Sequence, residues 1–157
     1  MIIVDTRERF IPRIQEIIAN ADTITPEFIF ANLGLSGGDY HVSNGGFEVR
    51  VERKSINDFA SNYDTLKPRL HHMRMTYETT ALLLEGTWKV KKDMVYVREG
   101  NTDVARMPYH TMVHFIVHQA SLGTWILHTM NFDESIECLM LIHDYLPKLN
   151  RPKPSLK

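Results

Sequence analysis

The sequence predicts a mixed α/β fold in which a central sheet is flanked by helices. Short apolar strands alternate with amphipathic helical segments along the chain, a pattern typical of α/β proteins. An Asn-Gly-Gly turn joins two extended segments and predicts an antiparallel hairpin, so we expect a mixed sheet. A length of 157 residues with 43% hydrophobic content suits one globular domain.

The chain begins with a predicted strand, helix and strand. Residues 2–4 are an apolar strand that ends at Asp5. Isoleucines recur at helical spacing over residues 11–18, and Pro12 falls in the first turn, where proline is tolerated. Residues 27–33 are expected to be extended.

The predicted hairpin follows. Residues 40–43 and 47–53 flank the turn Asn44-Gly45-Gly46. In the second arm, apolar and charged residues alternate from Phe47 onward, which gives the strand one apolar and one polar face.

A helical region is predicted next. Ser55 is expected to cap a helix reaching about Tyr63, because Asp58 stands three residues later as in a capping box. A second helix is expected from residue 65 to about 77. Residues 81–84 then form a buried strand. We interpret Glu85 at its end as a solvated loop acid and keep a supporting role behind the site residues as the alternative.

Residues 87–107 are polar and are not assigned by pattern. We consider a loop that meets substrate and a surface hairpin as alternatives.

A helix, a strand and a closing helix are predicted over residues 109–122, 125–128 and 134–146. We expect the domain to cover residues 1–146 and residues 147–157 to form a polar, proline-interrupted tail. The first of these helices is expected to bury Val113, Ile116, Val117 and Ala120.

His110, His114 and His118 repeat at four-residue spacing on the predicted helix 109–122. This spacing is compatible with zinc chelation. Because the row lies beside the expected buried stripe, we interpret it as a solvent-edge or interface row and keep a metal site as the alternative.

The composition limits the possible classes. The net charge of -1 excludes a globally basic nucleic-acid coat protein. The charge is unevenly spread, because residues 50–74 carry +3 and the remainder carries -4. This positive segment fits either a local patch that binds a polyanion or a solvated helix face. The single Cys138 excludes an intramolecular disulfide and fits a reducing, intracellular compartment. An acid follows three apolar residues, so we expect no signal peptide, and no apolar run approaches the length that spans a bilayer.

Three chemically active residues are expected to meet at the end of the hairpin. Asp39 precedes the first arm, and Glu52 and Lys54 share the polar face of the second. Two carboxylates provide the oxygen ligands that Mg²⁺ prefers, and a nearby lysine can orient or deprotonate water. Asp5 lies at a strand end, where sites in α/β proteins gather. The pattern therefore indicates phosphodiester cleavage, with an exposed cross-strand ion pair as the alternative.

Three sequence blocks together resemble the nuclease domain of the XPF/Mus-type structure-specific endonucleases. The blocks are Val4-Asp5-Thr6-Arg7-Glu8, Gly38-Asp39-Tyr40 and Val51-Glu52-Arg53-Lys54-Ser55-Ile56-Asn57-Asp58-Phe59. They stand in the order and spacing of the family's GD and ERK signature, which continues to an aspartate four residues after the lysine. The resemblance covers about residues 1–146 and implies a restriction-endonuclease-like fold, with a mixed central sheet flanked by helices.

The resemblance implies roles for the acidic residues and the lysine. Asp39 and Glu52 would be the principal ligands of Mg²⁺ or Mn²⁺, and Asp5 would be a third acidic ligand, direct or through water. Lys54 would be the catalytic lysine.

The resemblance also implies a surrounding set of charged residues. Arg53 is placed in the catalytic group. On a regular strand it faces away from Glu52 and Lys54, and it either pairs with Asp5 or Glu8 or contacts phosphate. Further residues around the site are Arg7, Glu8 and Asp58, and the basic residues expected to contact DNA are Lys67, Arg69, Arg74, Lys89, Lys91 and Lys92.

The leading hypothesis is a metal-dependent DNA endonuclease acting on branched, flap or fork DNA, in a homodimer or heterodimer formed through the C-terminal helices. One alternative is a non-catalytic DNA-binding or dimerisation subunit on the same fold. Another is a small enzyme for a phosphorylated metabolite, which the lack of a Gly-rich phosphate loop disfavours. The sequence has no glycine-rich helix-hairpin-helix module of the family type, so we expect modest, salt-dependent DNA affinity.

Overall fold

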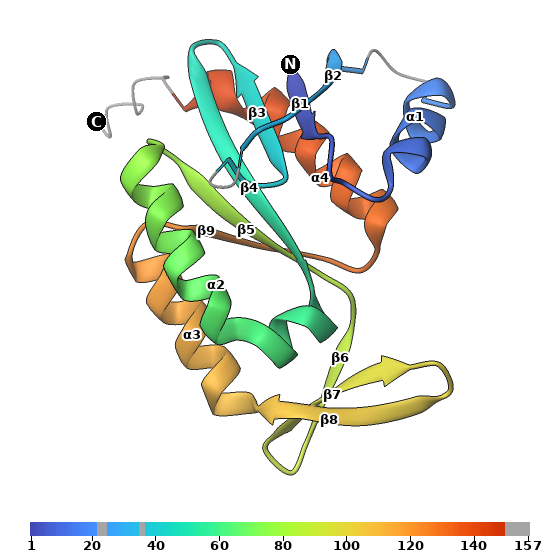
Figure 1. The fold of residues 1–157 in the computed structure, drawn as a ribbon, viewed down its shortest axis with the longest axis vertical. Coiled ribbons are helices and arrows are strands. Elements are labelled where there is room, and N and C mark those ends of the chain that lie inside the picture. Colours follow the sequence, from blue (N-terminus) through green and yellow to red (C-terminus); the bar gives the residue numbers. More distant parts are fainter. Residues whose placement is uncertain (22–24, 35–36, 150–157) are drawn as a thin grey trace, which may run out of the picture.

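A computed structural model describes residues 1–21, 25–34 and 37–149 of the chain. Figure 1 shows a central sheet with helices around it and a small second sheet at one end. The elements are β1 (Ile2–Asp5), α1 (Ile11–Ala19), β2 (Phe28–Ala31), β3 (Tyr40–Asn44), β4 (Phe47–Ser55), α2 (Ile56–Thr76), β5 (Thr80–Glu85), β6 (Trp88–Lys91), β7 (Met94–Glu99), β8 (Thr102–Pro108), α3 (Tyr109–Ser121), β9 (Trp125–Thr129), α4 (Phe132–Tyr145) and the 3₁₀ helix η1 (Leu146–Lys148).

The central sheet has six strands in the order β2-β1-β3-β4-β5-β9. The β3–β4 hairpin is antiparallel, whereas β4, β5 and β9 run parallel, so the predicted mixed sheet is confirmed. The hairpin turns at Gly45 and Gly46, whose φ angles of 61° and 86° are favoured by glycine.

The sheet separates two apolar layers. On one face, β1, β3 and β4 pack with α1 and α4; on the other, β5 packs with α2, α3 and the small sheet. Strand β5 contributes to both layers, since Ala81 and Leu83 belong to the first and Leu82 and Leu84 to the second. This two-sided burial explains why the strand is a continuous apolar run without polar alternation.

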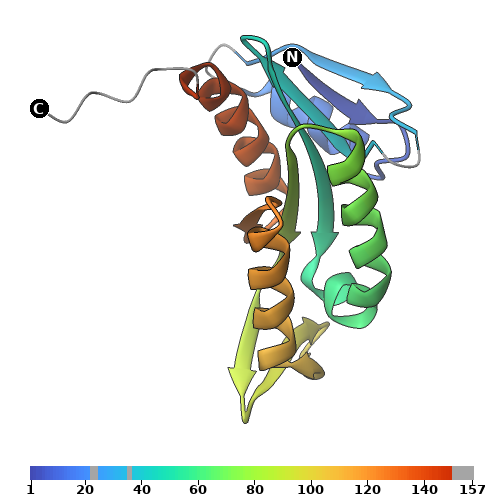
Figure 2. The same cartoon turned by 90° about the vertical axis from the view of Figure 1, so that its left-hand side faces the viewer.

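The two helices predicted after the hairpin are joined in α2. Ser55 caps the helix as predicted, because its hydroxyl accepts a hydrogen bond from the Asp58 amide. Asn62 has non-helical angles (φ -138°, ψ 28°) and marks a kink where the first predicted helix was expected to end. Figure 2 shows α2 and α3 along the same face of the molecule.

Residues 87–107 do not form a loop. They form most of a three-stranded antiparallel sheet, β6-β7-β8, that begins directly after β5. Val95, Val97 and Met107 anchor this sheet in the layer that contains α2 and α3. Of the two alternatives, the surface hairpin is therefore closer to the observed structure. The polar composition of the segment reflects a sheet with one face exposed.

The predicted buried stripe of α3 is wrong. The helix buries Met112, Phe115 and Gln119, whereas Val117 is 60% exposed. The ring of Phe115 packs edge-on against Phe59, with centroids 5.0 Å apart, and this contact fixes the rotation of the helix. The neighbour, and not the pattern on α3 itself, therefore selects the buried face; Ala120 is also exposed, and Val113 and Ile116 are partly buried.

The end of the predicted domain is structured slightly further than expected. Leu146 is fully buried and begins η1, which continues to Lys148. The rest of the predicted tail, residues 150–157, lies outside the described residues. No helix in the described part of the chain has the length and apolarity needed to cross a membrane.

The packing of α3 predicts opposite responses at neighbouring positions. Phe115→Ala is expected to lower the free energy of unfolding by about 3 kcal/mol or more, because it opens a cavity between α2 and α3. Val117→Ala is expected to change it by less than about 0.5 kcal/mol. Urea unfolding followed by circular dichroism measures both; an equal loss in the two variants would contradict this packing.

Candidate active site

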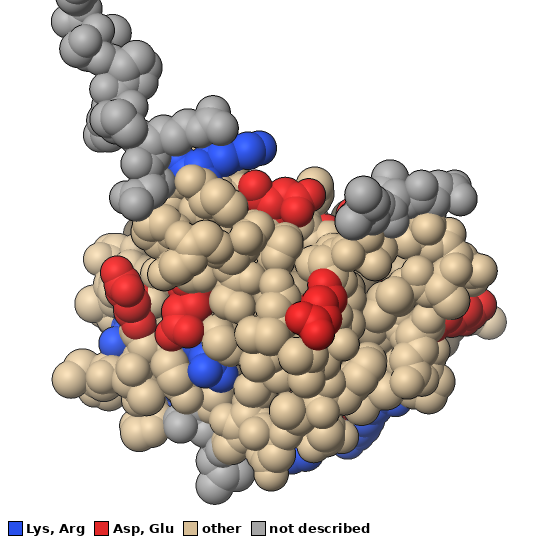
Figure 3. Space-filling model, turned by 90° about the horizontal axis from the view of Figure 1, so that it is seen from above, with Lys and Arg blue, Asp and Glu red and all other residues tan. Residues whose placement is uncertain are grey.

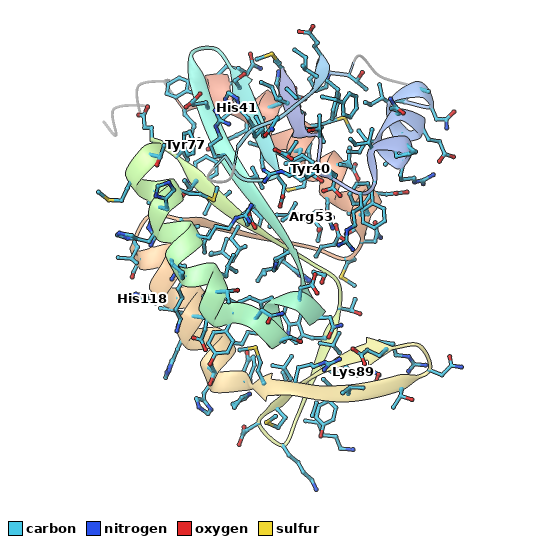
Figure 4. The ribbon with its side chains drawn as sticks, in the orientation of Figure 1. Tyr40, His41, Arg53, Tyr77, Lys89 and His118 are labelled. Atoms are coloured by element: carbon cyan, nitrogen blue, oxygen red, sulfur yellow. The ribbon has the colours of Figure 1, made fainter. Side chains whose placement is uncertain are left out.

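A cleft of about 590 Å³ opens where strand β4 ends. Figure 4 shows Tyr40 and Arg53 lying near one another in this region, on adjacent strands. Most of the residues singled out from the sequence line the cleft, namely Arg7, Glu8, Asp39, Glu52, Arg53, Lys54, Asp58 and Arg69.

The hairpin brings the two principal acids together. The Asp39 amide donates to the Val51 carbonyl oxygen over 2.8 Å, which places Asp39 beside Glu52. Gly38 makes this approach possible: its φ is 75°, and a Cβ atom there would stand 2.6 Å from the Val51 oxygen. The glycine of the Gly38-Asp39 pair is thus required by close backbone contact.

Asp39 and Glu52 are two carboxylates that burial and mutual repulsion make hard to ionise together. Glu52 is 3% exposed, and burial together with the charge of Asp39 raises its pKa to about 7. Burial likewise raises the pKa of Asp39. The Arg53 amide acts in the opposite direction and lowers this pKa, because it donates a hydrogen bond to Asp39 Oδ2 over 2.8 Å. The pair therefore favours a proton or another cation between its oxygens.

Two basic side chains flank the pair. Lys54 lies two residues after Glu52 on the same strand and lines the cleft. Arg69, from α2, brings Nη2 to 2.8 Å from Glu52 Oε2. This approach lacks the direction of a hydrogen bond, so Glu52 Oε2 is buried without a directed donor.

Asp5 is not brought into the cleft as a third acid. Its carboxylate accepts two hydrogen bonds from the Arg7 guanidinium, at 2.7 and 2.9 Å, and others from the amides of Arg7 and Leu33. The Arg7 side chain lowers the pKa of Asp5 to about 2. The Asp5 side chain is 2% exposed. Its visible role is to fasten the end of β1, because its oxygens are already engaged.

Arg53 turns away from the acid pair and joins a second cluster, as one of its predicted alternatives required. Its guanidinium donates to Glu8 Oε1 at 3.1 Å and to Glu85 Oε1 at 2.9 Å. Tyr40 donates to Glu8 over 2.7 Å, and burial and the Glu8 charge raise the pKa of Tyr40, which keeps its hydroxyl protonated. The Arg53 guanidinium also lies over the rings of Phe10 and Phe132.

The interpretation of Glu85 as a solvated loop acid is wrong. Its side chain is 13% exposed, pairs with Arg53 and accepts a hydrogen bond from Ser135 over 2.6 Å. The contact with Arg53 instead agrees with the alternative, a supporting role behind the site residues. Sequence reasoning ranked that alternative second because the parallel pairing of β4 with β5, which sets Ser55 opposite Glu85, is a long-range contact. The only available signal was the position of Glu85 at the end of a buried strand.

The residues expected to contact DNA lie in different places. Arg69 lines the cleft, whereas Arg74 is turned inward and donates to Gln119 and Thr124. Lys67 pairs with Asp64 on the exposed side of α2. The remaining lysines belong to β6 and the turn after it: Lys89, Lys91 and Lys92.

The acid pair fits a divalent metal ion that takes few protein ligands. Within the described ranges, no group of three or more His, Cys, Asp or Glu side chains has metal-binding geometry. Asp39 and Glu52 nevertheless provide adjacent oxygens, and Glu52 Oε2 lacks a directed donor. Mg²⁺ commonly binds through one or two carboxylates and completes its shell with water and phosphate oxygens.

The raised pKa of Glu52 predicts a pH-dependent stability without metal. Glu52 ionises more readily in the unfolded chain than in the folded protein. The protonated Glu52 therefore makes its full contribution to the free energy of unfolding below about pH 4.5, and this contribution is lost as the pH rises to about 7. Glu52→Gln should therefore unfold with a free energy higher than wild type by on the order of 2 kcal/mol near pH 8, and with little difference near pH 4. Urea titrations in chelator measure this. The exposed Glu27→Gln is the control, and a Glu52→Gln variant that is less stable at about pH 8 contradicts the argument.

This chain is similar to known proteins at the level of structure. The sequence matches no protein-family model, and no curated protein matches it. Among solved structures, XPF from Aeropyrum pernix is similar over 96% of this chain, with 22% identity and a TM-score of 0.63. XPF from Aeropyrum pernix in complex with DNA is similar over 91% of this chain, with 22% identity and a TM-score of 0.52.

The chain spans slightly less than two thirds of these solved chains, 65% and 64% of their lengths. At this identity the similarity establishes the fold. The restriction-endonuclease-like architecture implied by the three sequence blocks is confirmed, and the chain has an XPF-type nuclease fold.

Proposed function

We propose that this protein is a metal-dependent DNA endonuclease. The observation that supports the proposal most strongly is the pairing of buried Glu52 with partly buried Asp39, with Lys54 beside them, in a cleft open to solvent. Acids that resist simultaneous ionisation occur at functional sites, where a bound cation compensates for their repulsion. One of the similar XPF structures is a complex with DNA, which supports a nucleic-acid substrate.

Asp39 and Glu52 would hold the cation, Mg²⁺ or Mn²⁺, which when bound neutralises charge on the scissile phosphate and makes its water more acidic. The raised pKa of Glu52 means that this residue releases its proton as the cation binds. Lys54 would orient or deprotonate the attacking water and stabilise charge on the phosphate in the transition state. Arg69, whose side chain is 38% exposed, would then contact a phosphate oxygen.

We propose branched, flap or fork DNA as the substrate class. The proposal takes this class from the sequence resemblance, and the cleft itself accommodates a phosphodiester of any DNA. A non-catalytic subunit on the same fold is the other reading. The presence of Asp39, Glu52 and Lys54 together favours catalysis.

Substitution of the acid or the lysine is expected to abolish cleavage. Glu52→Gln and Lys54→Ala should each slow cleavage of labelled fork and flap DNA by about 100-fold or more, because each removes a group used in the transition state. Single-strand, duplex, flap, fork and four-way substrates with Mg²⁺ or Mn²⁺ define the preference. Glu27→Gln serves as the matched control.

Calorimetry separates the two readings. A catalytic domain should bind Mn²⁺ at a site that Glu52→Gln weakens, whereas a non-catalytic subunit should bind none. Wild-type rates in Glu52→Gln or Lys54→Ala would overturn the catalytic assignment.

We also propose a dimer through the C-terminal helices. An apolar groove of about 660 Å³ between β9 and α4 is lined by Trp125, Leu127, Leu141 and Tyr145, and Leu141 is 63% exposed. Strand β9 is also an edge of the central sheet. Exposed apolar surface of this kind is typical of protein interfaces.

The dimer predicts a mass change. Wild-type protein at high micromolar concentration should scatter light as a dimer, and Leu141→Asp should give a monomer with an unchanged circular dichroism spectrum, because the replaced side chain is exposed. A monomer mass for wild type would contradict this homodimer.

A further inference from the structure

Helices α2 and α3 together present a face that lacks acids and is rich in histidine. The chain has 19 Asp and Glu residues, yet residues 65–76 of α2 and all of α3 contain none. Five of the eight histidines lie on these two segments, and all five are exposed: His71, His72, His110, His114 and His118.

A groove of about 440 Å³ runs between the two helices, and we call it the histidine groove. Lys67 lines it from α2, and His110, His114 and His118 line it from α3. The rings of His110 and His114 are 6.0 Å apart between centroids, and Figure 4 places His118 on the outer side of α3. Tyr63 and Thr111 add hydroxyl groups to the lining. All these side chains can donate hydrogen bonds to an anion.

The charged groups that face the histidine row leave it largely uncompensated. On α2, Asp64 is paired with Lys67 at 3.0 Å, and Arg74 is bonded to Gln119 and Thr124. At the start of α3, the carbonyl of Asp93 accepts a hydrogen bond from the Tyr109 amide. Strand β8, packed against α3, contributes two charged residues that are already paired: Asp103 with Lys89, and Arg106 with Glu99. Strand β9 contributes His128, which contacts the Gly86 carbonyl oxygen.

We propose that the histidine groove binds the phosphodiester backbone of DNA outside the cleavage cleft, and that this contact strengthens as the groove histidines gain protons. The proposal rests on the proposed nuclease function for the identity of the polyanion. It differs from that function in its residues, since neither Lys67 nor the three histidines line the cleft.

Charge favours an anion over a metal ion in this groove. The lining includes the Lys67 ammonium group, which Asp64 contacts at 3.0 Å, and no carboxylate of its own. Within the described residues no group of three His, Cys, Asp or Glu side chains is arranged to hold a metal ion, so the histidine row is not a preformed metal site. Imidazole is the side chain that ordinarily changes charge between pH 5 and 8, and three imidazolium groups with Lys67 would give up to four phosphate contacts. The surface seen in Figure 3 is different, because Asp and Glu side chains are scattered across it.

The test measures binding without cleavage. Fluorescence anisotropy of labelled fork DNA is recorded with the full chain in chelator, near pH 6 and near pH 7.5. Wild type should bind roughly 10-fold more tightly at the lower pH, and the triple variant His110→Gln, His114→Gln, His118→Gln should lose most of that gain. The salt dependence at the lower pH should also become less steep in the triple variant.

Two further variants define the site. His72→Gln replaces an exposed histidine that does not line the groove, and it should keep the full pH response. Lys67→Ala should weaken binding at both pH values, since it removes an ammonium group from the groove. Circular dichroism and melting temperature should match wild type in every variant, because the replaced side chains are exposed.

The outcomes distinguish this proposal from the nuclease assignment. A pH response that survives in the triple variant overturns the histidine groove as a DNA contact, whatever the cleavage rate. Binding to anionic lipid vesicles without binding to DNA also overturns it, as does Zn²⁺ binding that depends on the three histidines while DNA affinity does not. If wild type cleaves none of the DNA substrates but binds DNA through the groove, the nuclease assignment is rejected and the DNA-binding proposal stands.

Discussion

The candidate active site depends on two carboxylates held side by side, of which Glu52 is buried and Asp39 is partly buried. Asp39 immediately precedes the first arm of the hairpin, and Glu52 lies in the second. Burial raises the pKa of both carboxyls, and the charge of Asp39 raises that of Glu52 further. Such a pair is unfavourable for folding when charged. It persists because the surrounding structure fixes it: the Gly38 backbone approaches Val51 closely, and the Arg53 amide holds Asp39.

The ion cluster behind the pair gives the strand end its rigidity. Arg53 joins Glu8 and Glu85, and so links the segment after β1 to the end of β5. The rings of Phe10 and Phe132 cover its guanidinium, which strengthens these contacts by excluding water. Glu52, Arg53 and Lys54 all line the cleft, but they have different partners. Glu52 and Lys54 share the strand face of the acid pair, and Arg53 anchors the strand through Glu8 and Glu85.

The two candidate surfaces for a nucleic acid differ in their charged residues. The cleft combines buried acids with Lys54 and Arg69, a combination suited to a metal ion and one reacting phosphate. The histidine groove has no acid in its lining, and we propose that it contacts the DNA backbone. A bound duplex that met both would be positioned by one and cut by the other, which is the usual division between backbone contacts and chemistry.

The sequence by itself determined the elements of the central sheet and the hairpin, because turn chemistry and strand alternation are local. The cleft residues Asp39, Glu52 and Lys54 followed from their spacing together with the resemblance of the three sequence blocks. Tertiary structure decided the rest. It engaged Asp5 with Arg7, paired Arg53 with both Glu8 and Glu85, folded residues 87–107 into a second sheet and rotated α3. The Asp5–Arg7 pair joins residues only two positions apart, but the other outcomes depend on partners far along the chain. A periodic pattern carries no information about which distant partner a side chain will meet.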